Sequence, residues 1–231
     1  MQAFTLVIDA GHGGKDPGAI GRKSKEKNIN LAVALELGRL IEKNCPDVKV
    51  VFTSKTDVFV ELSKRAEIAN KAKADLFISI HVNSTSAKVG PQGTETFTLG
   101  MHRAADNLEV AKRENSVITL ESNYEQRYEG FDPNSSESYI IFELMQDKNM
   151  EKSVQLAKNI QQQFRTTAKR VDKGVYQAGF LVLRETSMPS ALVELGYINN
   201  PTEEQYLAST NGQAALAKCI YNGFVSYKKA N

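Results

Sequence analysis

The sequence of 231 residues lacks any long apolar segment, and its charges nearly cancel. No run of about 18 or more apolar residues occurs, so we expect no helix that spans a bilayer. The formal net charge is +2 at pH 7, from 29 Lys and Arg against 27 Asp and Glu. This excess is too small to indicate binding to nucleic acid or to a membrane surface through a strongly basic patch.

Cysteine is scarce as well, and a secretory signal is missing. Cys45 and Cys219 are the only cysteines, and both lie in helix-like stretches far apart in the sequence. Two buried free thiols are the simpler interpretation and a disulfide is the alternative, so cysteine usage does not fix the compartment. The N-terminus enters a strand-like stretch with neither a basic region nor the apolar region of a signal peptide. Either the protein is cytoplasmic, or its targeting segment is not among these residues.

Apolar runs of strand length alternate with helical patterns along most of the chain. Strand-like runs occupy residues 4–9, 48–53, 75–82, 93–99, 179–184 and 190–196. Apolar residues recur at helical spacing in residues 27–44, 60–74, 150–169 and 212–229. Several strands are too apolar to have a solvent face, which is typical of a layered α/β fold. We therefore expect a single domain over residues 1–231, with a twisted, mostly parallel or mixed sheet of about six strands flanked by helices.

Residues 100–150 interrupt this alternation with a charged and polar stretch. Helical patterns near 104–121 and 136–147 flank a polar turn at "FDPNSS". About 50 residues is long for a connection in such a fold. Insertions of this length are typical of functional lids or of variable decoration.

Three polar residues stand at the ends of predicted strands. His12 lies in the glycine-rich loop of "VIDAGHGGKDPGAIG", His81 lies in "FISIHVNS", and Glu194 ends the apolar strand of "ALVELGYINN". Ligand sites in open α/β sheets form outside the carboxyl ends of the strands. A carboxylate buried there generally needs a partner for its charge. Two imidazoles and a carboxylate at one sheet edge indicate a zinc site.

A zinc site needs a further ligand, and Glu26 at the start of the first predicted helix is the candidate. The alternative for Glu26 is an ordinary first-turn acid that complements the helix dipole. A phosphate loop at "GHGGKDPG" is disfavoured, because the stretch fits neither common phosphate-loop pattern and Pro17 has no N–H to offer an anion.

Contacts can also be predicted for two charged residues outside this set. Asp9 is predicted either to orient one of the imidazoles or to cap the turn that follows it. Arg65, in the second predicted helix, is expected to pair with a nearby acid such as Asp57.

Five motifs, in this order along the chain, carry a family resemblance. They are "VIDAGHGGKDPGAIG", "SKEKNINLA", "RAEIANKAKADLFISIHVNS", "GTETF" and "PSALVELGYINNPTEEQYL". Together they resemble the zinc-dependent N-acetylmuramoyl-L-alanine amidases of bacterial cell walls, in the branch called amidase type 3. The insertion at 100–150 is similar to that of the cell-division amidases, where such a segment holds an inhibitory helix over the metal.

The resemblance implies roles for individual residues. His12, Glu26 and His81 match the family's ligands for one Zn²⁺, and Glu194 of "VELG" matches its catalytic glutamate. Glu114 of "AKREN" matches the glutamate that occupies the open metal position in the inhibitory branch. The alternative for Glu114 is a surface acid on a helix.

The function implied is hydrolysis of the amide bond between N-acetylmuramic acid and L-alanine of the peptidoglycan stem peptide. The resemblance further implies autoinhibition by the insertion and activation during cell separation by a protein partner that displaces the insertion helix. Peptidoglycan lies outside the cytoplasmic membrane, so it implies a periplasmic or otherwise extracytoplasmic location. Two alternatives remain open, a peptidoglycan-binding regulator without turnover and a zinc peptidase that acts within the stem peptide.

Overall fold

The computed structural model describes residues 3–102, 104–144 and 148–231, built around a mixed sheet with strand order β2-β1-β3-β6-β4-β5. The strands β2, β1, β3 and β6 are parallel, β4 is antiparallel to β6, and β5 is parallel to β4. The predicted α/β class with a mostly parallel or mixed sheet is confirmed. The strands are β1 (Phe4–Ala10), β2 (Val48–Phe52), β3 (Leu76–Asn83), β4 (Thr94–Leu99), β5 (Asp172–Ala178) and β6 (Ser190–Tyr197).

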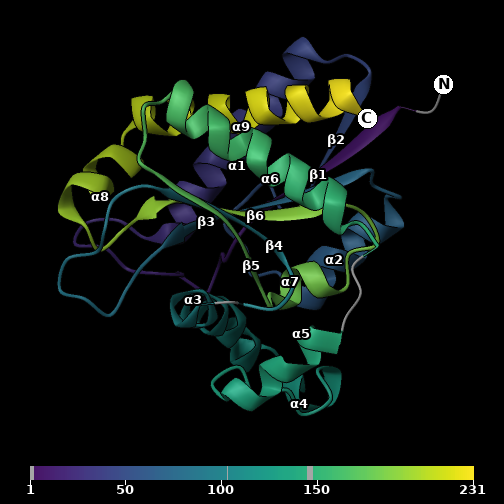
Figure 1. The fold of residues 1–231 in the computed structure, drawn as a ribbon, viewed down its shortest axis with the longest axis vertical. Coiled ribbons are helices and arrows are strands. Elements are labelled where there is room, and N and C mark those ends of the chain that lie inside the picture. Colours follow the sequence, from purple (N-terminus) through teal and green to yellow (C-terminus); the bar gives the residue numbers. More distant parts are fainter. Residues whose placement is uncertain (1–2, 103, 145–147) are drawn as a thin grey trace.

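Helices cover both faces of the sheet (Figure 1). On one face lie α1 (Glu26–Asn44), α6 (Met150–Thr166) and α9 (Thr210–Ala230). On the other lie α2 (Leu62–Lys71) and α7 (Leu181–Arg184). A short helix, α8 (Pro201–Leu207), follows β6 and was not predicted. Because both faces are covered, every residue of β3 and of β6 is buried, as their apolar sequences predict.

The segment between β4 and α6 forms a separate group of short helices on the α2 side of the sheet (Figure 1). Its helices are α3 (Ala105–Asn115), η1 (Ser116–Leu120), α4 (Tyr124–Arg127), η2 (Ser136–Ile140) and α5 (Ile141–Leu144). The predicted helix at 104–121 is present as α3 and η1. The predicted helix at 136–147 is present as η2 and α5, and its last three positions lie outside the described residues.

One predicted strand was wrong. Within residues 179–184, Leu181–Arg184 form the helical turn α7, and the sixth strand is β5, from the more polar sequence just before it. A short apolar run does not distinguish a buried strand from a buried helical turn by its periodicity. β5 tolerates polar residues because it is an edge strand of the sheet and is only partly buried.

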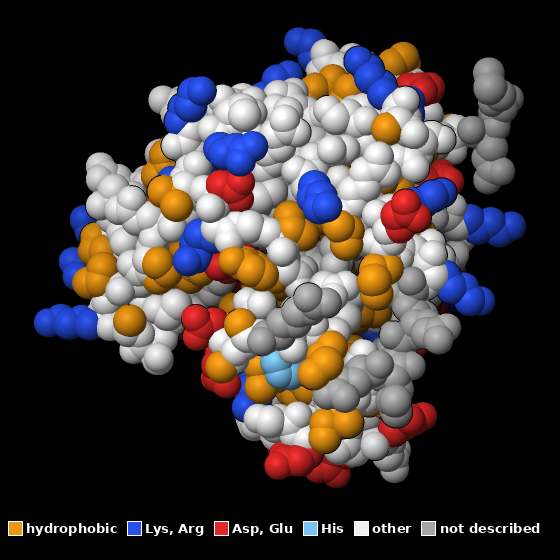
Figure 2. Space-filling model, viewed as in Figure 1, with side chains coloured by type: hydrophobic (Ala, Val, Ile, Leu, Met, Phe, Trp, Pro, Cys, Tyr) orange, Lys and Arg blue, Asp and Glu red, His pale blue; other side chains and the backbone are white. Residues whose placement is uncertain are grey.

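The distribution of charged side chains on the surface agrees with the small net charge. Lys and Arg side chains are interspersed with Asp and Glu over much of the face shown in Figure 2. Among the described residues, no helix has both the length and the apolar character needed to cross a membrane.

Two leucines of α1 test how the helix packs. Leu37 is 0% exposed and Leu35 is 38% exposed. We expect Leu37→Ala to lower the free energy of unfolding by about 2–5 kcal/mol, because it leaves a cavity against the sheet. Leu35→Ala should lower it by less than about 1 kcal/mol. Urea titration followed by circular dichroism measures both, and equal losses would contradict the packing described.

Candidate active site

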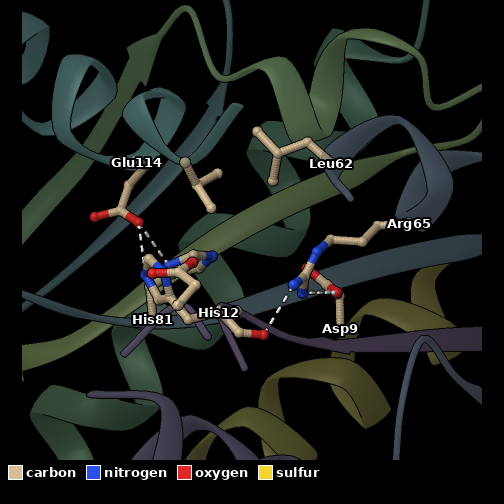
Figure 3. A pocket seen from close by; sticks show the side chains of 9 residues that line it. Asp9, His12, Leu62, Arg65, His81 and Glu114 are labelled. Carbon is tan, nitrogen blue, oxygen red and sulfur yellow. Dashed lines mark hydrogen bonds and ion pairs between the residues drawn. The ribbon is translucent and has the colours of Figure 1, made fainter. Parts of the chain in front are cut away.

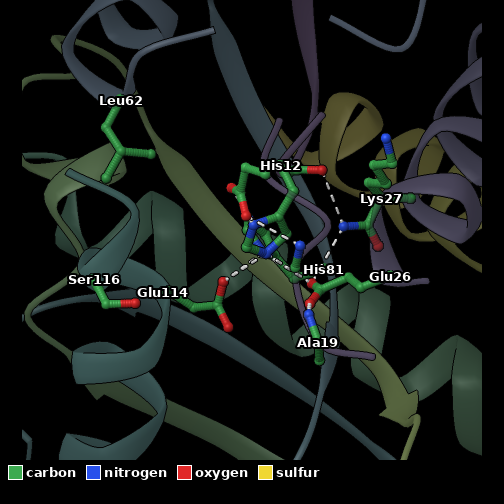
Figure 4. Close-up of polar contacts among 12 residues, drawn as sticks. His12, Ala19, Glu26, Lys27, Leu62, His81, Glu114 and Ser116 are labelled. Carbon is green, nitrogen blue, oxygen red and sulfur yellow. Dashed lines mark hydrogen bonds and ion pairs between the residues drawn. The ribbon is translucent and has the colours of Figure 1, made fainter. Parts of the chain in front are cut away.

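The carboxyl ends of β1, β3 and β6 bring the predicted site residues to one edge of the sheet. His12 follows β1, and His81 of β3 lies directly opposite Glu194 of β6 in the strand ladder. Glu26 begins α1, which starts at the same edge, and Glu114 comes from α3 of the insertion (Figure 4). His12, Glu26, His81 and Glu114 each offer one ligand atom, and these atoms all lie within 4.8 Å of one another. The structure therefore brings together all four residues that the resemblance assigns to the metal position.

The glycines of the first loop allow this close approach. His12 itself has a φ of 66°, in the left-handed region that non-glycine residues rarely adopt. A Cβ atom on Gly11 would lie 2.3 Å from Cε1 of His81. A Cβ atom on Gly18 would lie 2.7 Å from both Cδ2 of His12 and Oε2 of Glu26. A larger residue at either position would therefore displace a side chain of the site.

The four side chains point at a common centre. Nε2 of His12 lies 3.1 Å from Oε1 of Glu26 and 3.1 Å from Oε2 of Glu114. Nδ1 of His81 lies 3.3 Å and 2.9 Å from the same two oxygens. Yet Nε2 of His12, Nδ1 of His81 and Oε2 of Glu114 are buried and form no hydrogen bond with any residue that the structure describes.

This arrangement fits a zinc ion. Ligand atoms about 2.0–2.1 Å from a tetrahedral zinc lie about 3.3 Å from one another. The four nitrogen–oxygen separations of 2.9–3.3 Å are close to this value. Imidazole nitrogens and carboxylate oxygens are also donors that zinc accepts. Atoms that aim at one point, rather than at each other, are explained by a cation at that point.

Hydrogen bonds from outside the cluster orient two of these ligands. Nδ1 of His12 lies 2.7 Å from Oδ2 of Asp16, and an ionised carboxylate can only accept, so Nδ1 carries the proton and Nε2 offers its lone pair. Glu26 is completely buried and accepts hydrogen bonds from the backbone N–H groups of Ala19 and Val82, each at 2.8 Å. Glu26 is therefore more than a first-turn acid. Asp16 was not predicted, although its position four residues after His12 was a signal for it.

The charges within the cluster depend strongly on one another. Burial disfavours the charged form of His81, but the carboxylate of Glu114 overcomes this and raises the pKa of His81 to about 10. Burial also favours a neutral Glu26, whereas His12 beside it lowers the pKa of Glu26 to about 2. The carboxylates of Glu26 and Glu114 remain ionised at neutral pH, where the protonated imidazoles balance their charge. A divalent cation at the common centre would replace these imidazole protons.

Glu194 has a different environment from these two carboxylates. It is 1% exposed, and among the described residues neither of its oxygens has a hydrogen-bond partner. Burial, followed by the charge of Glu114, raises the pKa of Glu194 well above its usual value. A buried carboxyl whose pKa is raised, beside a candidate metal position, is a candidate to accept a proton and pass it on.

Beneath the site lies an ion pair between Asp9 and Arg65, both almost completely buried (Figure 3). Nη1 of Arg65 lies 2.8 Å from Oδ1 of Asp9. Arg65 therefore pairs with an acid as expected, but the acid is Asp9 and not Asp57, because Arg65 points into the protein, where Asp9 needs a counter-charge. Asp57 instead accepts from Lys27 at 2.7 Å, near the surface.

The end of α3 is attached to the sheet edge by Arg113 as well as by Glu114. Arg113 donates from Nη1 to the carbonyl of Ser84 at 2.5 Å and from Nη2 to Oδ1 of Asn83 at 2.9 Å. Its Nε donates to Oε1 of Glu114 at 3.2 Å. Glu114 is 4% exposed, so it is not the surface acid that the alternative interpretation predicts.

Known proteins are similar to this chain in fold and in sequence. Residues 6–226 match the family Amidase_3, described as N-acetylmuramoyl-L-alanine amidase. The N-acetylmuramoyl-L-alanine amidase AmiA of Escherichia coli strain K12 is 33% identical over 226 residues, which cover 96% of this chain and 75% of AmiA. A crystal structure of an N-acetylmuramoyl-L-alanine amidase from Clostridium difficile 630 is 28% identical, with a TM-score of 0.74 and 100% of both chains covered. The CwlD amidase from Clostridioides difficile, in complex with the GerS lipoprotein, is 26% identical, with a TM-score of 0.72 over 99% of this chain and 100% of CwlD. The chain belongs to the N-acetylmuramoyl-L-alanine amidase family.

Proposed function

We propose that the chain is a zinc-dependent hydrolase that cleaves the amide bond between N-acetylmuramic acid and L-alanine of the peptidoglycan stem peptide. The observation that carries this proposal is the set of buried ligand atoms without hydrogen bonds, aimed at one point beside the buried carboxyl of Glu194. In this proposal His12, Glu26 and His81 hold one zinc ion. Two histidines and one carboxylate are a ligand set of catalytic zinc sites, which leave a coordination position for substrate or water.

The metal and the residues around it have different roles in the proposed reaction. When bound, zinc acts as a Lewis acid that polarises a carbonyl and lowers the pKa of water. Glu194 takes a proton from the attacking water and passes it to the departing amine of L-alanine. The substrate reaches these groups through a cleft of about 290 Å³ between the first loop and α3, lined by residues that include His12, Glu26 and Leu120.

The first test identifies the bond that is cut. We expect the purified protein to bind about one equivalent of zinc and to release from peptidoglycan stem peptides that begin with L-alanine. A chelator should stop the release, and added zinc should restore it. Mass spectrometry of the products distinguishes an amidase from the two alternative functions. Cleavage between stem amino acids would identify a peptidase, and zinc binding without any product would identify a regulator without turnover.

A second test concerns Glu194. Glu194→Gln keeps the size of the side chain but cannot accept the proton of water, so we expect turnover to fall about 10²- to 10⁴-fold. Zinc content should stay at the wild-type level, since Glu194 is not among the proposed ligands. Both are measured on the same preparation, by product release and by metal analysis. Release of stem peptides at the wild-type rate would remove Glu194 from the mechanism.

We also propose that α3 holds the enzyme inactive until a protein partner moves it. Glu114 places Oε2 within 3.1 Å of both histidine nitrogens, where it takes the coordination position that water needs. Arg113 adds contacts to the end of β3 that hold the helix in place. A related amidase forms a complex with a lipoprotein, which supports a protein as the partner. Since peptidoglycan is the substrate, we propose an extracytoplasmic location for the enzyme.

Two glutamates on α3 test this regulation. Glu114→Ala should raise the basal rate, roughly 5- to 150-fold, because the closed arrangement loses its contact with the metal position. Glu109→Ala is the matched control, because Glu109 lies on the same helix with its side chain 69% exposed. The rate on peptidoglycan without any partner protein is the measurement. A Glu114→Ala rate equal to that of Glu109→Ala would end the proposal that α3 inhibits.

A further inference from the structure

Ser79 connects the buried ion pair to one of the histidines. It lies in β3 two residues before His81, so both side chains are on the same face of the strand. Oγ of Ser79 lies 2.6 Å from Oδ2 of Asp9 and 3.1 Å from Nε2 of His81. Asp9 and Ser79 are 0% exposed and His81 is 5% exposed, so water does not compete for these hydrogen bonds.

The number of available protons fixes the direction of both hydrogen bonds. Although burial opposes ionisation, Arg65, Ser79 and Thr53 together lower the pKa of Asp9, so this residue is a carboxylate. A carboxylate can only accept, and the single hydroxyl proton of Ser79 must therefore point to Asp9. Ser79 can then only accept from His81. It follows that Nε2 of His81 carries a proton and that the lone pair for a metal is on Nδ1, the atom that faces the cluster.

We propose that Ser79 is a positioning residue for zinc binding, which relays the negative charge of Asp9 to Nε2 of His81 and so aims Nδ1 at the metal. The inference rests on the zinc site of the proposed function. Histidine ligands commonly donate their second N–H to a carboxylate, a carbonyl or water, and a hydroxyl relay to a carboxylate serves the same purpose here.

Arg65 fixes the carboxylate from which this relay starts. Its Nη1 donates to Oδ1 of Asp9 at 2.8 Å and to the carbonyl of Ala10 at 2.7 Å, and its Nη2 donates to the carbonyl of His12 at 2.8 Å. The same guanidinium therefore holds the backbone that carries His12 and the carboxylate that orients His81.

The two oxygens of Asp9 have different partners, and this asymmetry makes the relay testable. Oδ1 accepts from Thr53 at 2.6 Å and from Arg65, whereas Ser79 is the one donor to Oδ2 within the described part of the chain. In Asp9→Asn the amide oxygen must face the two donors, which turns the NH₂ group toward Ser79. Ser79 would then accept from the amide and donate to Nε2 of His81, and the proton of the imidazole would move to Nδ1.

Thr53 supplies a matched control for Ser79. Each hydroxyl donates one hydrogen bond of 2.6 Å to Asp9, and both residues are buried, but only Ser79 also contacts a histidine. Ser79→Ala and Thr53→Val should therefore affect stability to similar extents. They should differ only in their effect on the metal.

The experiment measures zinc dissociation constants by competition with a chelator. We expect Ser79→Ala and Asp9→Asn to bind zinc about 10- to 100-fold more weakly than the wild type. Thr53→Val should bind zinc about as tightly as the wild type. Equal affinities of Ser79→Ala and Thr53→Val, in a wild-type protein that does bind zinc, would overturn the relay and leave the proposed function intact. A wild-type protein without zinc affinity would overturn both.

A measurement on the wild type avoids variants that fail to fold. In the zinc-loaded protein, long-range ¹H–¹⁵N NMR correlations show which imidazole nitrogen of His81 carries the proton. We expect the proton on Nε2, and a proton on Nδ1 would overturn the assignment of the relay.

Discussion

The buried ion pair between Arg65 and Asp9 determines how the candidate active site is held. Arg65 connects α2 to the end of β1 and to the loop after it, and Asp9 connects β1 to Ser79 in β3. Loss of either partner would leave the other charge buried and unpaired, which is among the most costly defects in a protein interior. Because one ion pair reaches both strands, the loop that carries His12 is fixed relative to the strand that carries His81.

The remaining parts of the site differ in how they are attached. Glu26 belongs to α1, which packs in the main core, and Glu194 belongs to the central strand β6. Glu114, by contrast, comes from the insertion, where the aromatic rings of Phe131, Tyr139 and Phe142 contact one another in edge-to-face and tilted arrangements, with centroids 5.1–6.2 Å apart. The buried residues of the insertion belong to the same hydrophobic cluster as α2, α7 and this face of the sheet. Apolar packing therefore holds α3 in place in addition to the polar contacts of Arg113 and Glu114.

The sequence predicts the site better than it predicts what supports the site. His12, His81 and Glu194 stand out because polar residues are conspicuous at the ends of apolar strands, and parallel strands bring such ends together. The partner of Arg65 was not predictable, because it depends on which side of α2 faces the sheet. Ser79 gives no signal, since a serine inside an apolar strand is unremarkable until its neighbours in space are known. A strand was predicted at 179–184 but is found just before it, as β5, for a related reason. Pairing within the sheet, and not local apolar content, decides which segment becomes a strand.

The left-handed backbone at His12 has an evolutionary consequence. A residue other than glycine in this conformation is strained by about 1–3 kcal/mol. Glycine would relieve the strain but would remove the imidazole. Selection for thermal robustness and selection for activity therefore act in opposite directions on this codon. A descendant freed from the need to catalyse would be expected to lose histidine at this position early.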